Sequence, residues 1–138
     1  MKKLLLIILS FTLTCCCFLL IGCSSKKEVY NFSMLTIEEN ETEFSFEVGD
    51  KYEGVRLTED YFTIILDEDK AVLRRCYTET HGEETETYKE AFVCNIIEGI
   101  NNELYMYPEG EEDALILVKE KNTLTLDFDG MLLVLTKE

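Results

Sequence analysis

Beyond residue 28, apolar and polar residues alternate in short runs that are separated by polar turns. A period of two is typical of strands with one buried face, because successive side chains of a strand point to opposite sides. The runs span residues 30–37, 44–48, 55–57, 61–66, 71–77, 91–97, 103–107, 114–119, 123–128 and 131–136. This spacing predicts an all-β fold, an antiparallel meander of about eight to ten short strands that forms a barrel or a sandwich.

Two hairpins can be registered from their turns. Asp129-Gly130 is typical of a type I′ turn. Centring a hairpin on it puts six apolar residues on one face, in the pairs Phe128 with Met131, Leu126 with Leu133, and Leu124 with Leu135. The acidic turn 67–70 likewise pairs Leu66 with Ala71 and Ile64 with Leu73.

Residues 88–98 fit two structures. A capping box at 87–90, the stop at Gly99 and apolar residues spaced by four (Tyr88, Phe92, Ile96, Ile100) indicate a helix. Against this, Val93, Ile96 and Ile97 are β-branched, and Phe92, Cys94 and Ile96 alternate as on a strand face. We favour the strand.

The first 22 residues have the layout of an export signal. Lys2 and Lys3 precede residues 4–21, which are uncharged and largely apolar. The segment ends in Leu20-Ile21-Gly22-Cys23, which resembles the lipobox of bacterial lipoproteins. That resemblance implies that Cys23 receives a diacylglyceryl group on its thiol and that signal peptidase II cuts after Gly22.

The expected organisation is therefore a lipoprotein signal peptide (1–22), a lipidated tether (23–28) and one exported domain (29–138), held on the extracytoplasmic face of the cell membrane. An uncleaved span is the main alternative, since about 17 to 25 apolar residues cross a bilayer. A plain anchor, however, has no reason to end in Gly-Cys-Ser-Ser. A conventional cleavage site is disfavoured because Leu20 is too large for the −3 position, and cytoplasmic retention does not fit the segment.

The exported domain is strongly acidic. The net charge of the chain is −15, and loss of Lys2 and Lys3 with the signal makes it −17, because residues 1–22 contain no acid. Binding to nucleic acids or to anionic lipids requires clustered Lys and Arg, so neither is an expected partner of the domain. Only Lys26 and Lys27, beside the anchor, could contact lipid head groups favourably. The simplest interpretation is a solvated surface that keeps the domain soluble.

Only two cysteines remain in the domain after processing, Cys76 and Cys94. Outside the cytoplasm they can pair if they lie opposite each other, which would centre their hairpin on Thr85. The alternative is two buried thiols that act as small apolar side chains.

Three segments resemble the small lipocalin-like lipoproteins of low-GC Gram-positive bacteria: YNFSM at residues 30–34, YFTIILDEDKAVL at 61–73 and NTLTLDFDGMLLVLTKE at 122–138. The resemblance covers most of the domain and implies a lipocalin-like barrel and an envelope location. It carries over no catalytic residue.

Motifs for chemistry are scarce. His81 is the only histidine and sits in a charged loop, and the sequence has no zinc-ligand spacing, phosphate-binding glycine loop or G-x-S-x-G elbow. Asp67-Glu68-Asp69 lacks the glycine and terminal Glu of a calcium loop. We therefore expect no enzyme, cofactor or metal; a hydrolase would need two carboxylates that converge in a cleft.

Binding or scaffolding remains. An eight-stranded barrel can hold one small ligand, and we expect a small apolar or amphiphilic one in a cavity lined by Phe44, Phe46, Phe62, Ile64, Tyr105 and Tyr107. The alternative is a protein interaction module of the cell envelope with a packed core and no ligand.

Overall fold

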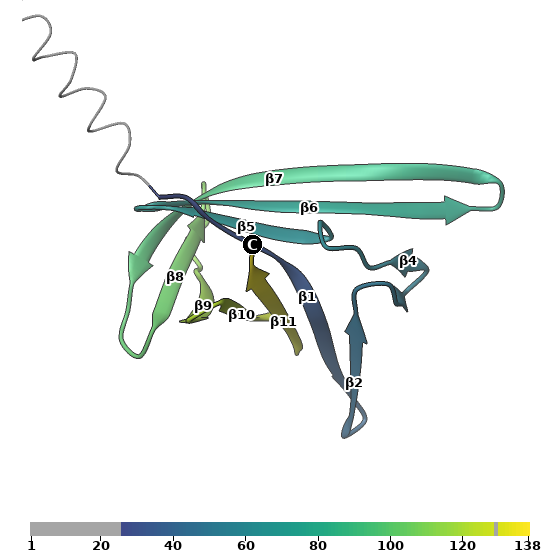
Figure 1. The fold of residues 1–138 in the computed structure, drawn as a ribbon, viewed down its shortest axis with the longest axis horizontal. Coiled ribbons are helices and arrows are strands. Elements are labelled where there is room, and N and C mark those ends of the chain that lie inside the picture. The colour runs from purple at the N-terminus through teal and green to yellow at the C-terminus, as the bar shows by residue number, and fades with distance from the viewer. Residues whose placement is uncertain (1–25, 129) are drawn as a thin grey trace, which may run out of the picture.

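A computed structural model describes residues 26–128 and 130–138, which fold into a closed antiparallel barrel with one additional strand at its edge (Figure 1). The ring consists of β1 (Glu28–Glu39), β5 (Phe62–Asp67), β6 (Lys70–His81), β7 (Glu84–Glu98), β8 (Glu103–Pro108), β9 (Leu115–Glu120), β10 (Thr123–Phe128) and β11 (Met131–Lys137). Pairing of β11 with β1 closes it. The all-β prediction is confirmed, as a barrel.

Three strands lie outside the ring. β2 (Thr42–Glu47) pairs with the second half of β1, and β3 (Lys51–Tyr52) with β4 (Val55–Arg56) forms a small separate hairpin. The predicted signal peptide and the lipidation of Cys23 lie outside the described residues. In the part of the chain that the structure describes, no helix has the length and apolarity needed to cross a membrane.

Both predicted hairpin registers are confirmed. β10 and β11 pair Phe128 with Met131 and Leu124 with Leu135, and β5 and β6 pair Ile64 with Leu73. Residues 88–98 belong to β7, which pairs with β6 on one side and β8 on the other. The strand, which the β-branched residues favoured, is therefore confirmed. A helix in this position would leave both neighbouring strands without backbone partners.

Cys76 and Cys94 do not lie opposite each other, so the condition for their pairing is not met. The β6–β7 turn falls at Gly82, whose φ of 67° provides the left-handed conformation, and not at Thr85. Cys76 therefore lies opposite Lys89, five residues before Cys94 on β7 and roughly 17 Å away at about 3.4 Å per residue. Disulfides need Cα atoms about 4.4–6.8 Å apart, and both cysteines are free.

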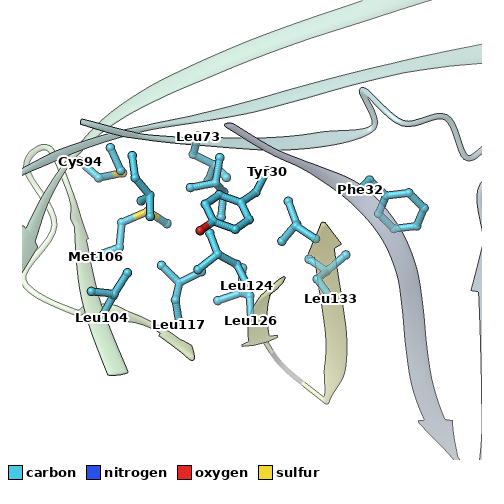
Figure 2. Close-up of a cluster of buried hydrophobic side chains, with 14 of the residues drawn as sticks. Tyr30, Phe32, Leu73, Cys94, Leu104, Met106, Leu117, Leu124, Leu126 and Leu133 are labelled. Atoms are coloured by element: carbon cyan, nitrogen blue, oxygen red, sulfur yellow. The ribbon is translucent and has the colours of Figure 1, made fainter. Parts of the chain in front are cut away.

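The core occupies the inside of the ring. Its fully buried members come from most of the strands and include Ile64 and Leu135. Tyr30, Met106, Leu117 and Leu124 are also fully buried and are labelled in Figure 2. Each has neighbours two residues away on the same inner face, as strand alternation requires. Full burial of one such side chain contributes about 1.5–3 kcal/mol.

The two ends of the barrel differ. At the base, where β1 begins, the Glu28 carboxylate accepts hydrogen bonds from Lys119 of β9 and from Lys137 of β11, the latter at 2.6 Å. These contacts lower the pKa of Glu28 from 4.5 to about 2. The opposite end, the mouth, is formed by the start of β5 and the β10–β11 turn.

A long hairpin arm projects beyond the barrel. It consists of residues 76–89, the distal parts of β6 and β7, and Figure 1 shows it extending past the other strands. β5 stops pairing at Arg75 and β8 stops at Cys94, so the arm has no ring neighbour on either side. Because it starts at the mouth, its first residues border the barrel opening.

Candidate ligand cavity at the barrel mouth

A cavity of about 320 Å³ lies inside the mouth. Seven strands and Tyr61, which precedes β5, contribute to its wall, which apart from Arg75 and Glu90 consists of apolar and aromatic side chains: Leu35, Tyr61, Phe62, Leu73, Phe92, Leu115, Leu126, Phe128, Met131 and Leu133. Leu35 and Leu126 are each 2% exposed, whereas Phe92 and Phe128 are nearly half exposed. The cavity therefore runs from a dry floor to a rim in contact with solvent.

Strand alternation explains this gradient. Leu124, Leu126 and Phe128 follow one another along the inner face of β10, and their exposure rises towards the mouth. The inner faces of the strands thus extend beyond the packed core towards the mouth. The cavity is the upper part of the barrel interior, where side chains no longer meet across the axis.

Arg75 is the cation in this wall. It occupies the inner-face position after Leu73 on β6, opposite Phe62 of β5 and Glu90 of β7. Its Nε atom is buried without a hydrogen-bond partner, and Arg75 forms no ion pair with any described residue. A buried donor left unsatisfied costs about 1–3 kcal/mol. Arg75 also lines the cavity, so the wall contains a cation that has no acid partner among the described residues.

Aromatic rings position the Arg75 guanidinium. Its central carbon lies 4.6 Å from the ring centroid of Tyr77 and 5.7 Å from that of Tyr61. Tyr77 stacks on Tyr88 across the arm, with centroids 5.1 Å apart, and Tyr61 packs edge-on against Phe32. Such cation–π contacts contribute about 0.5–2 kcal/mol without neutralising the cation.

Tyr88, which stacks on Tyr77, remains neutral at physiological pH. The Tyr88 hydroxyl donates a hydrogen bond to Glu86 at 2.7 Å, which raises the pKa of Tyr88 to about 12. Tyr88 therefore supplies no negative charge to this end of the arm at neutral pH.

The six residues predicted to line a cavity lie in different parts of the structure. Phe62 lines it, and Ile64, one inward position deeper on β5, is fully buried in the core. Phe44 and Phe46 do not line it, because β2 lies outside the ring; they border a groove with Tyr52 of β3 instead. For these two residues the prediction is wrong.

Tyr105 and Tyr107 are also misplaced by the prediction. β8 turns Leu104 and Met106 into the core, so the two tyrosines point outwards. The Tyr105 hydroxyl donates to Glu103 at 2.9 Å, and this hydrogen bond raises the pKa of Tyr105.

Sequence reasoning missed Arg75, Phe92 and Phe128. The signal for Arg75 was present: with the 67–70 turn as centre, Ala71 and Leu73 face inwards, and Arg75 is the next residue of the same parity. A charged residue at a core-facing position is the kind of local inconsistency that marks functional sites.

Within the described ranges, no group brings together three His, Cys, Asp or Glu side chains that could hold a metal ion. His81 lies near the tip of the arm, where its Nε2 is 3.1 Å from a carboxylate oxygen of Glu79. Its side chain is 70% exposed. The site therefore offers shape, apolar surface, the cation of Arg75 and the exposed carboxylate of Glu90 at the rim.

No protein-family model matches the chain, and neither a curated protein nor a solved structure matches it. The functional argument thus depends on the geometry of the mouth.

Proposed function

We propose that this protein is a membrane-anchored extracytoplasmic lipoprotein whose barrel binds a small apolar or amphiphilic ligand and does not transform it. The observation that carries the proposal is the 320 Å³ cavity with its apolar wall. Ligand sites are typically concave, mostly apolar and about 300–1,000 Å³ in volume. An apolar cavity of about 150 Å³ already holds benzene.

The direction of the chain supports this function. β1 begins at the base, and the mouth lies at the opposite end. A lipid anchor on Cys23 would hold the base towards the membrane, separated from β1 only by residues 24–27. The mouth would then face the surroundings of the cell, where a ligand can enter.

The competing function is an envelope interaction module. It is favoured by apolar residues on the outer wall, including Ile97 and Ile116, which are 59% and 47% exposed and are both aligned with Tyr105 of β8. Such a module needs no cavity. The mouth, in contrast, exposes apolar side chains to water, which is unfavourable unless they serve a binding site. The cavity therefore favours the ligand-binding function.

Tryptophan fluorescence of the full chain tests the proposal, because the sequence contains no natural Trp. Phe128→Trp places a reporter at the rim of the cavity, and Leu132→Trp places one on the outer face of β11. We expect dodecanol, titrated into protein in phosphatidylcholine nanodiscs, to blue-shift the emission of the first variant saturably and to leave the second unchanged. Equal, non-saturable responses would contradict a binding site at the mouth.

A further inference from the structure

We infer that the cavity selects single-chain amphiphiles with a carboxylate head group and that Arg75 recognises the carboxylate; this inference deepens the proposed function and rests on it. Arg75 combines the properties of such a site. Its guanidinium borders the apolar wall, its Nε is buried without an acceptor, and two aromatic rings hold it in place. A planar guanidinium matches a carboxylate through two parallel hydrogen bonds.

Glu90 is the obvious internal partner for Arg75, and the structure does not use it. The two residues are directly opposed on β6 and β7, yet no hydrogen bond or ion pair joins them. Glu90 is exposed at the rim, so water solvates its carboxylate. Arg75 lines the cavity, so its guanidinium is left for an acceptor that enters there.

The position of Arg75 also determines the orientation of the ligand. Leu73, the preceding inner-face residue of β6, is 8% exposed, and the floor beyond it contains Leu35 and Leu126. An alkyl chain would lie on this floor with its carboxylate at the rim. The volume, about twice that of a cavity that holds benzene, suits one medium-length chain and not a two-chain lipid.

Apart from Glu90, which lines the rim opposite Arg75, the acidic surface does not oppose this selectivity at short range. The net charge of −15 acts mostly through exposed carboxylates, whose fields are screened beyond about 8 Å at physiological ionic strength. A buried charge-assisted hydrogen bond is screened much less. The hydrogen bond to Arg75 therefore determines which head group the cavity prefers.

Photocrosslinking of the full chain in phosphatidylcholine nanodiscs tests the inference. The probes are diazirine-bearing dodecanoic acid and the matching dodecanol, with labelled residues located by peptide mass spectrometry and yields normalised to lipid labelling. The variants are Arg75→Gln and its matched control Arg74→Gln, which removes the same charge from the neighbouring outward position. Glu90→Gln tests whether the opposed carboxylate is a hidden partner.

In the wild-type chain and in R74Q we expect the acid to label cavity residues about tenfold more than the alcohol, as one charge-assisted hydrogen bond permits. R75Q should lose this preference and keep alcohol labelling, which also reports that it is folded. E90Q should retain or increase the preference.

Equal labelling by acid and alcohol in the wild-type chain would overturn the inference and leave the proposed function standing. So would a preference that survives in R75Q or disappears in E90Q. Absence of cavity labelling by either probe would overturn the proposed function itself. Should R75Q not fold, a wild-type ratio near one still overturns the inference.

Discussion

The guanidinium carbon of Arg75 lies 4.6 Å from the centroid of the Tyr77 ring, two residues further along the inner face of β6. The ring fixes the direction of the cation and leaves its charge in place. An ion pair in the same position would cancel that charge. Arg75 is therefore both held at the mouth and able to bind an anion.

Removal of the Tyr77 ring should weaken head-group selectivity. We expect Tyr77→Leu to reduce the preference for dodecanoate over dodecanol about two- to fivefold, because a cation–π contact of about 0.5–1 kcal/mol no longer orients Arg75. Tyr77→Phe keeps the ring and should behave as the wild type. The crosslinking ratio measures both, and an equal loss in the two variants would assign the effect to the hydroxyl.

Glu28 should make the stability of the barrel depend on pH in the acidic range. Its pKa is lowered from 4.5 to about 2 by hydrogen bonds from Lys119 and Lys137. A group with a lowered folded-state pKa stabilises the fold above its unfolded pKa, and this contribution is lost as the pH falls from about 4.5 to 2. These contacts join β1 to β9 and β11 across the base.

We therefore expect Glu28→Gln to lower the free energy of unfolding by about 1–2 kcal/mol at pH 7, after allowance for partial solvent screening. Denaturant unfolding at a series of pH values should show the difference from the wild type shrinking towards pH 2. Glu120→Gln, at the same end of the barrel and exposed, is the control and should have little effect. A difference that does not vary with pH would contradict the role of the Glu28 charge.

The two domain cysteines should remain thiols with different reactivity. Cys94 is 1% exposed, and burial raises the pKa of its thiol, whereas Cys76 lies on the outer face of the arm and is partly exposed. The thiolate is the reactive form, so N-ethylmaleimide should label Cys76 in the native chain and Cys94 only after unfolding. Peptide mapping without reductant checks this, and a Cys76–Cys94 peptide would contradict the β6–β7 register.

Local patterns sufficed for much of the fold. Alternation and the turn at Asp129-Gly130 correctly paired Leu124 with Leu135, because a two-residue turn fixes which residues face each other. The β6–β7 turn could not be placed from the sequence, because the polar run 78–90 contains several turn-compatible positions and little apolar pattern. Only the positive φ at Gly82 distinguishes one of them.

The site required information that no single strand contains. Phe44 and Phe46 alternate as well as any core strand, and nothing local reveals that β2 lies outside the ring. The error at Tyr105 was one of parity, since Leu104 and Tyr105 are both acceptable inner residues until the pairing of β8 with β7 is known. Arg75 was overlooked although its inward parity follows from the 67–70 turn, because a charged residue is not expected at a core-facing position.

Native mass spectrometry of the full chain, isolated from membranes before and after organic extraction, is the most direct test of ligand binding at the mouth. Met131→Trp should fill the cavity, and Leu132→Trp, its outward neighbour, should not. We predict an additional discrete mass on the wild type and on L132W that disappears on extraction and is absent from M131W. The cells are grown with dodecanoate, so that a candidate ligand is present. A bare protein mass for the wild type, L132W and M131W would then contradict the account and favour a packed interaction module.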